Sequence, residues 1–340
     1  MNRFKIMMAG LSMAVSITSC DHPVSMETTV HPDGALDKTI TIFADSVAIE
    51  TNFLGVSSRT GWQTELFKGD STNDDRDKLY IRFQKHFNSS EEANQELAAQ
   101  SDTLFHVTSH FERKFRWFYT YWYYSDTYQA INRMTLPIGD YFSPEDFAFI
   151  NRLPPEGKPI SKADSLYLNQ LHEKIFDVYG SRALFDNLYE KLVAQLKEQN
   201  HRRWIDSLAS YKEELYGRFI DEGDKGDSII FSKLVYTPGF PLTKGELSEL
   251  EEETDRLVSF FSTAANGKYF HQINMPGTVV NSNADSLMQS SLFWRPNTTR
   301  FLLKDYTMFA ESRKLNGWTV IISGILVAVA VGINFYRKTR

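Results

Sequence analysis

The segment LFHVTSHFERKFRWFYTYWYYSDTY, residues 104–128, has the composition of β-structure. Aromatic and β-branched residues are enriched in strands, so we predict a strand-like conformation throughout this segment. The run RWFYTYWYY inside it places seven aromatic residues in the eight positions from Trp117 to Tyr124. Successive side chains of a strand point to opposite faces, so this run predicts a strand that is aromatic on both faces.

Three interpretations of the aromatic run remain open. It is a central strand packed on both faces, a stacking platform for an apolar ligand or a glycan, or a contact with a membrane surface. Tyrosine and tryptophan suit all three, because each combines an apolar body with a polar tip. If the run binds a ligand, the candidate residues are Trp117, Tyr119, Tyr121 and Trp122.

The flanking sequence predicts more strands around a helical region. Residues 24–44 alternate on both sides of Pro32-Asp33-Gly34, which indicates a β-hairpin, and residues 78–87 alternate as a strand. Between 143 and 222 the apolar residues recur at helical spacing, with Ser143-Pro144 as a helix start and Gly180 as a helix stop. Thr243 and Glu246 predict a further helix to about residue 266, and strands resume after Lys268. We predict an α+β fold: a β-rich domain with a helical insertion at about 143–222.

The C-terminus contains a candidate membrane span. Residues 318–336 carry no charge, and 19 residues of helix extend about 28 Å, close to the thickness of a bilayer core. Trp318 and Tyr336 bracket the run as interfacial aromatics. The basic tail 337–340 follows, and basic flanks favour the cytoplasmic side of a membrane.

The N-terminus carries an export signal. Arg3 and Lys5 precede 14 uncharged residues, a run too short to span a bilayer. The run ends at Ile17-Thr18-Ser19-Cys20, and Cys20 is the only cysteine of the chain. This resembles the lipobox of bacterial lipoproteins, in which the cysteine takes a diacylglycerol thioether and becomes the first mature residue.

Together the two ends predict the organisation of the chain. Residues 1–19 are a lipoprotein signal peptide, 20–316 an extracytoplasmic domain, 318–336 a transmembrane helix and 337–340 a cytoplasmic tail. The predicted location is the bacterial inner membrane, with the main domain on the periplasmic side, because spans of the outer membrane are barrels. The aromatic-rich style also resembles uncharacterised lipoproteins of Bacteroidota.

Charge and motif content exclude several classes of function. The ends hold five of the 37 basic residues, so 32 basic residues face 43 acidic ones in the extracytoplasmic part, a net charge of −11. Such a domain repels nucleic acid and anionic headgroups. The sequence has no HExxH, no GxSxG and no phosphate-binding glycine loop, so we expect no enzyme, no cofactor and no metal site. His106 and His110 lie about 13 Å apart on a strand, too far to share an ion.

One further resemblance concerns the C-terminal third. This part of the chain resembles the end of LppM-type extracytoplasmic domains in the order of its features: Met275-Pro276-Gly277, Asn283, Trp294, a last long strand and a membrane helix. The hairpin at Asp33-Gly34 is similar as well, whereas the helical insertion and Ala284 depart from that pattern. The resemblance implies a β-rich, often lipid-anchored architecture.

The functional prediction is therefore limited. We expect a doubly anchored envelope lipoprotein with a non-enzymatic role, whose partners are the membrane and another envelope protein. The alternative is a binding module that takes an apolar or glycan ligand on the aromatic strand 117–124.

Overall fold

The computed structural model describes residues 22–45, 55–69, 78–99, 106–223, 237–265 and 267–338. The signal peptide predicted at 1–19 and the lipidation site predicted at Cys20 lie outside these residues. The described residues form two compact units. We call them the β unit (His22–Gln129, Lys268–Pro296 and the chain from Asp305 onward) and the helical unit (Ala130–Gly267 and Asn297–Lys304).

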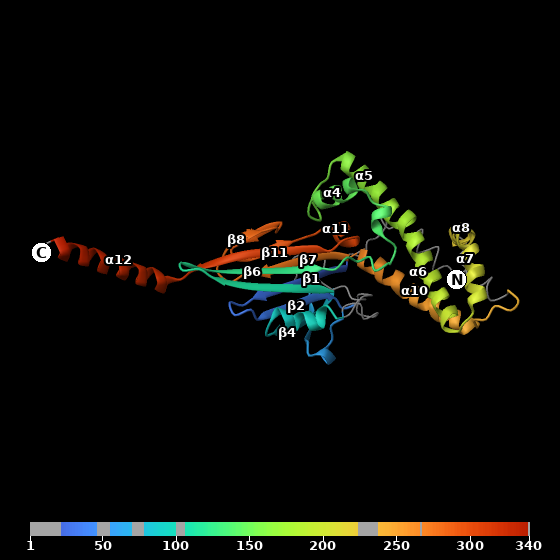
Figure 1. Ribbon diagram of the computed structural model, residues 1–340, viewed down its shortest axis with the longest axis horizontal. Coiled ribbons are helices and arrows are strands. Elements are labelled where there is room, and N and C mark those ends of the chain that lie inside the picture. Colours follow the sequence, from blue (N-terminus) through green and yellow to red (C-terminus); the bar gives the residue numbers. More distant parts are fainter. Residues whose placement is uncertain are drawn as a thin grey trace. The chain divides into compact units, whose positions relative to one another are not determined.

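The β unit contains two β-sheets (Figure 1). The first has seven strands in the order β3 (Gln63–Lys68), β4 (Leu79–Phe87), β2 (Leu36–Phe43), β1 (His22–Val30), β7 (Gly267–Asn274), β10 (Ser291–Trp294) and β9 (Ser286–Met288). The second has four strands in the order β5 (Val107–Phe115), β6 (Tyr119–Tyr128), β11 (Tyr306–Leu315) and β8 (Thr278–Ser282). A short 3-10 turn, η1 (Ser58–Thr60), precedes β3, and the helix α3 (Ser90–Leu97) follows β4.

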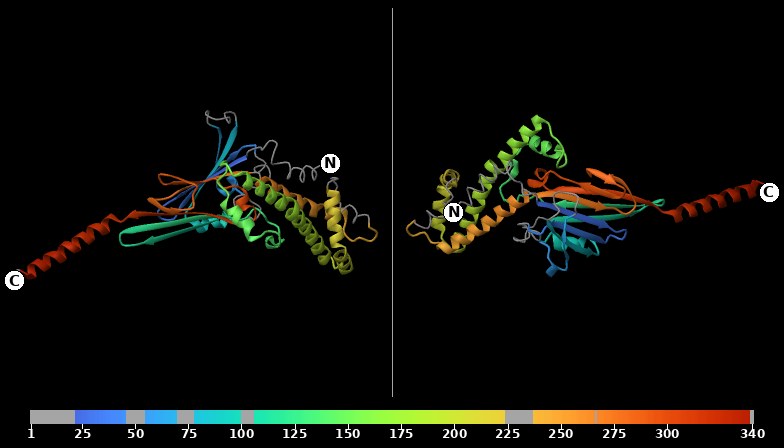
Figure 2. Two further views of the ribbon diagram at one scale, coloured as in Figure 1. Left: turned by 90° about the horizontal axis from the view of Figure 1, so that it is seen from above. Right: turned by 180° about the vertical axis from the view of Figure 1, so that it is seen from behind.

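The two sheets pack face to face as layers, which Figure 2 shows from above. Side chains of β1, such as Met26, meet side chains of β6, such as Tyr128, across the interior. The alternation of buried and half-exposed residues along β1 and β2 confirms the hairpin that the sequence predicts around Asp33-Gly34. Gly34 has φ +103°, and a β-carbon there would lie 2.8 Å from the ring of Phe111, so only glycine fits this turn.

The helical unit contains η2 (Ile138–Asp140), α4 (Pro144–Arg152), α5 (Lys162–Glu173), η3 (Lys174–Gly180), α6 (Ser181–Glu198), α7 (Arg202–Ser210), α8 (Lys212–Gly223), α10 (Lys244–Ala265) and α11 (Thr299–Leu302). The helix starts follow the sequence signals. Ser143 accepts a hydrogen bond from the backbone of Asp146, and Thr243 accepts one from Glu246. Apolar side chains of α6, among them Phe185 and Leu192, form one core with Leu247 and Leu250 of α10.

One helix boundary differs from the prediction. Gly180 does not end a helix, because α5 continues through the π-helical turn η3 directly into α6. The backbone of Gly180 is helical, with φ −61° and ψ −46°. A wider π turn brings Gly180 against the carbonyl oxygen of Ile175, where a β-carbon would lie only 3.0 Å away. The glycine therefore serves close backbone approach inside a helix instead of helix termination.

The last element is α12 (Gly317–Lys338), which follows β11 directly (Figure 1). It is 22 residues long and strongly apolar, and its side chains are almost all exposed. Among the described residues this helix has the length and composition to cross a membrane. The predicted α+β fold with one apolar C-terminal helix is confirmed.

Candidate functional site

The aromatic run is not one continuous strand, so the prediction for 104–128 needs correction. Strand β5 ends at Phe115 and β6 begins at Tyr119, with Trp117 and Phe118 at the turn between them. Arg116 and Tyr119 exchange two backbone hydrogen bonds of 2.7 and 3.0 Å that close this hairpin. The turn contains no glycine, asparagine or proline, which is why the local sequence did not reveal it.

A residue far away in the sequence holds this turn in place. The side-chain amide of Asn316 donates to the carbonyl oxygen of Arg116 at 2.9 Å, and its backbone N–H donates to that of Phe118 at 2.8 Å. The ring of Trp318 stacks on Phe115 at 6.2 Å between centroids and meets Trp117 edge-on at 5.9 Å. The indole N–H of Trp117 donates to Ser323, in the second turn of α12, at 2.8 Å.

The four predicted ligand-binding residues do not share one surface. Tyr119 and Tyr121 lie half-buried on the outer face of the second sheet, with ring centroids 6.2 Å apart. Trp122 points the opposite way, into the space between the sheets, and is 4% exposed. Trp117 is at the turn and 46% exposed. A single stacking platform from all four residues is therefore excluded by the pleat of β6.

Trp122 instead forms one wall of an open pocket between the two sheets. The pocket has a volume of about 480 Å³ and is lined by Thr29, Val30, Pro32, Trp122, Asn274, Met275, Pro276, Gly277, Ser290 and Lys314. Its lining is mostly apolar, and Lys314 is exposed at its edge. Lys314 makes no hydrogen bond or ion pair within the described part of the chain.

Backbone contacts fix the shape of this pocket. The indole N–H of Trp122 donates to the carbonyl oxygen of Pro32 at 3.0 Å, and the hydroxyl of Ser312 donates to that of Pro276 at 2.6 Å. Gly277 has φ +77°, and a β-carbon there would lie 2.6 Å from the carbonyl oxygen of Arg313. The turn after β7 thus approaches β11 more closely than any other residue type allows.

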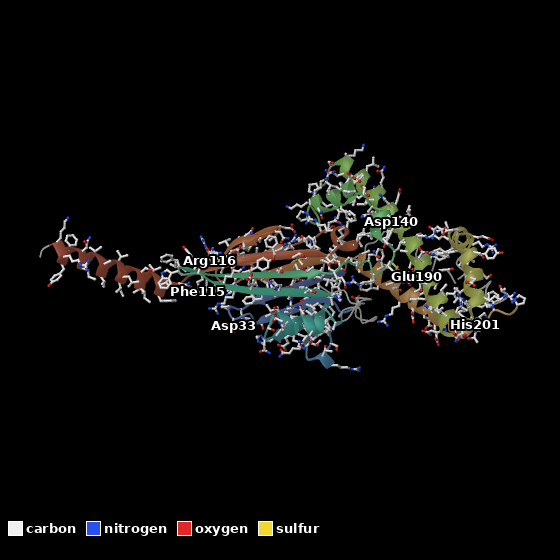
Figure 3. The ribbon with its side chains drawn as sticks, viewed as in Figure 1. Asp33, Phe115, Arg116, Asp140, Glu190 and His201 are labelled. Carbon is white, nitrogen blue, oxygen red and sulfur yellow. The ribbon has the colours of Figure 1, made fainter. Side chains whose placement is uncertain are left out.

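The pocket opens at the end of the β unit from which α12 begins. Its residues come from the ends of β1, β7 and β11, from the turns that follow β1 and β7, from β6, and from the turn between β9 and β10. Figure 3 shows Asp33, in the β1–β2 turn, and the hairpin residues Phe115 and Arg116 all toward the side of α12. We call this end of the β unit the helix-proximal end.

The helix-proximal end is basic and aromatic. Five exposed cationic residues lie there: Arg113, Lys114, Arg116, Arg313 and Lys314. Beside them the large side chains of Phe115, Trp117, Phe118 and Trp318 are each about half exposed. The predicted repulsion of anionic headgroups rested on the net charge of the whole domain, whereas these cationic side chains gather at one end of it. Basic residues beside exposed aromatic residues are typical of protein surfaces at a membrane–water interface.

Deeper in the sandwich lies a buried charged network. Lys38 and Asp126, both fully buried, form an ion pair at 3.0 Å between β2 and β6. Tyr124 and Ser109 donate to the same carboxylate at 2.7 and 2.5 Å. Burial raises the pKa of Asp126, but the attraction of Lys38 and the hydrogen bonds lower it more, so the group stays ionised. Because Lys38 lies on β2 and Asp126 on β6, this buried network joins the two sheets.

A second buried polar contact lies in the interior of the β unit. The ring of His271 lies 2.5 Å from the hydroxyl of Tyr128, and burial lowers the pKa of His271 to about 3. The imidazole is therefore neutral at physiological pH. Burial and the nearby Asp126 raise the pKa of Tyr128, so its hydroxyl also stays uncharged.

Comparisons with known proteins add little. No family model matches the chain, and no curated protein matches it in sequence. A similar solved structure is the folded domain of LppM from Mycobacterium tuberculosis, with 9% identity and a TM-score of 0.30 over 89% of this chain and 96% of that one. A TM-score of 0.30 is too low to transfer fold or function from that domain to this chain.

Proposed function

We propose that this chain is a membrane-anchored envelope protein whose β unit binds an amphiphile, a molecule with an acyl chain and an anionic headgroup, without chemically changing it. The observation that carries this proposal is the pocket of about 480 Å³ with apolar walls and Lys314 at its edge. A volume of this size lies within the range of about 300–1,000 Å³ that is typical of small-molecule sites.

The energetics of the pocket favour an acyl chain. Each buried methylene contributes about 0.8 kcal/mol, so six of them supply about 5 kcal/mol before the cost of ordering the chain. The exposed ammonium of Lys314 has no described partner and suits a phosphate or carboxylate headgroup. Trp117 and Trp318 are exposed, and tryptophan is enriched at the membrane–water interface. If these two rings lie in that interface, the pocket opens close to the lipid headgroups.

The anchoring scheme is part of the proposal. A diacylglycerol on Cys20 and the helix α12 hold the chain in the inner membrane, with the β unit on the periplasmic side and 337–340 in the cytoplasm. Protease added to spheroplasts should digest the β unit, and a cytoplasm-specific reporter after Arg340 should be active. Cys20→Ala should lose the metabolic fatty-acid label but stay membrane-bound through α12. If any of these results fails while an amphiphile is still recovered, the anchoring scheme is wrong and the pocket assignment stands.

The ligand is tested by extraction. Full-length protein is purified in a mild detergent, and the bound lipids are released and counted by mass spectrometry. We expect about one amphiphile per chain, and at least tenfold less in Ser290→Trp, which fills the pocket from its edge. Lys314→Glu should select against anionic species. Tyr121→Ala, on the outer face of the second sheet, is the matched control and should retain the wild-type amount. Equal recovery from wild type and Ser290→Trp refutes the proposal.

A second candidate function is contact with another envelope protein. The observation that favours it is the row of half-buried rings on the outer face of the second sheet: Tyr119, Tyr121, Tyr123 and Phe309. Arg313 lies over Tyr119 at 4.6 Å, and tyrosine and arginine are enriched at protein interfaces. A photo-cross-linking amino acid at position 121 should capture a protein in intact cells if this candidate is correct. If it is not correct, the cross-linked products should match those of wild type, which lacks the cross-linker.

A further inference from the structure

A cluster of two histidines and one carboxylate lies on the first sheet, outside the pocket. His31 Nε2 is 2.6 Å from one carboxylate oxygen of Asp37, and His86 Nδ1 is 2.6 Å from the other. The possible ligand atoms of the three residues all lie within 4.8 Å of one another. The side chains are 38–56% exposed, so ions have free access to them.

Regular backbone structure positions all three residues. Asp37 and His86 are direct cross-strand partners of β2 and β4, and paired side chains of neighbouring strands lie on the same face. His31 begins the β1–β2 turn, where its carbonyl oxygen accepts from Gly34 at 3.0 Å and its N–H donates to Ala35 at 2.9 Å. The cluster therefore rests on paired strands and a closed turn, and only side-chain torsions must change for the ligand atoms to converge.

We propose that His31, Asp37 and His86 form a binding site for a zinc ion. Two imidazoles with one carboxylate, and water in the fourth position, is a ligand set that Zn²⁺ takes in proteins. Calcium and magnesium prefer oxygen ligands alone, so the two imidazoles select against them. With bonds of about 2.0 Å, tetrahedral ligand atoms lie about 3.3 Å apart, within the 4.8 Å that the cluster already spans.

The ion ties the turn to the sheet. Pro32, the neighbour of His31, lines the pocket and accepts the hydrogen bond from Trp122. A metal bound to His31, Asp37 and His86 joins the β1–β2 turn to β4 and thereby stiffens this wall of the pocket. The site does not depend on the pocket's having a ligand, so the two proposals stand or fall separately.

The test uses full-length protein without a histidine tag, purified in detergent and stripped of metal with a chelator. Co²⁺ is titrated as a spectroscopic probe, because tetrahedral Co²⁺ absorbs in the visible range, and Zn²⁺ is then added in competition. We expect one equivalent bound by wild type. His31→Ala, His86→Ala and Asp37→Ala should each weaken binding at least 100-fold, while His110→Ala, which removes an exposed histidine of β5, should leave it unchanged.

A second measurement separates loss of the site from loss of the fold. Zn²⁺ should raise the thermal unfolding temperature of wild type and of His110→Ala, and should not raise that of His86→Ala, whose circular dichroism should remain native. Equal Co²⁺ affinity in wild type and His86→Ala would show that the three residues form only hydrogen-bonded ion pairs. No stoichiometric binding by wild type at 100 μM probe, a concentration of the order at which weak metal sites fill, would overturn the proposal as well.

Discussion

Removing Lys38 while keeping Asp126 should destabilise the β unit severely. Both groups are fully buried, and their ion pair at 3.0 Å joins the two sheets. Breaking a buried pair from one side leaves an uncompensated charge and costs about 3–5 kcal/mol. In Lys38→Met the carboxylate keeps the hydroxyl donors Tyr124 and Ser109, so we expect the low end, about 3 kcal/mol. Asp126→Leu leaves the ammonium with only two oxygen acceptors and should cost about 5 kcal/mol.

The double variant Lys38→Met/Asp126→Leu distinguishes pairing from packing. It removes both charges together, so it should lose at least 3 kcal/mol less than the two single variants summed. Urea unfolding of the detergent-solubilised chain, followed by tryptophan fluorescence in a Trp204→Phe background, confines the signal to the described tryptophans of the β unit. Additive losses, or a loss below about 1 kcal/mol for Lys38→Met, would refute the reasoning.

The pH dependence of this pair has a defined sign. The pKa of Asp126 is lowered in the folded state, because Lys38 and the hydrogen bonds outweigh the effect of burial. Its contribution is therefore complete above the unfolded pKa of about 3.9 and is lost as the pH falls through the folded value. The difference in unfolding free energy between wild type and Lys38→Met should therefore shrink as the pH falls below about 4.

Three further predictions concern other parts of the chain. Burial raises the pKa of Asp146, but hydrogen bonds from Lys174 and Tyr167 lower it to about 2. Asp146→Asn should therefore cost the helical unit about 2 kcal/mol at pH 7 and much less near pH 2, where the folded carboxyl is half protonated. Urea unfolding at both pH values measures this, and an equal cost at both would contradict it. Gly277→Ala should cost about 2 kcal/mol or more and abolish amphiphile recovery, whereas Gly157→Ala, also at positive φ (+80°) but in open space, should cost about 1 kcal/mol; equal losses in thermal unfolding would count against the close approach at Arg313. In nanodiscs of brominated lipid, Trp117→Phe should reduce the quenched fraction of tryptophan fluorescence while Trp62→Phe, which removes a 2% exposed ring, should not; an unchanged fraction in Trp117→Phe would place the hairpin outside the interface.

Elements with local signals could be predicted from the sequence. The β1–β2 hairpin follows from Asp33-Gly34, the start of α4 from Ser143-Pro144, and α12 from its uncharged length. Each depends on contacts between residues close in the chain. The turn at Trp117-Phe118 could not be predicted, because Asn316 and Trp318, about 200 residues away, hold it in place.

The candidate site was harder to predict for the same reason. The pocket joins residues from Thr29 to Lys314, and no spacing within the sequence shows that these segments meet. Net charge does not show where charges lie, and the basic residues that gather at the helix-proximal end are outnumbered by acidic residues elsewhere in the chain. The sequence does contain one signal for this basic end. It consists of two basic pairs close to exposed aromatic residues, Arg113-Lys114 and Arg313-Lys314. His31 and His86 are 55 positions apart and become neighbours only through the pairing of β2 with β4.

The most direct test of amphiphile binding is photo-cross-linking in living cells. A benzophenone amino acid replaces Ser290, which lines the pocket, or Tyr121, on the outer face of the second sheet, and mass spectrometry identifies what each position captures after irradiation. The pocket account predicts an adduct of one acyl-chain amphiphile at position 290 and none of that species at position 121. An adduct of protein alone at 290, or the same lipids at both positions in equal yield, would contradict it.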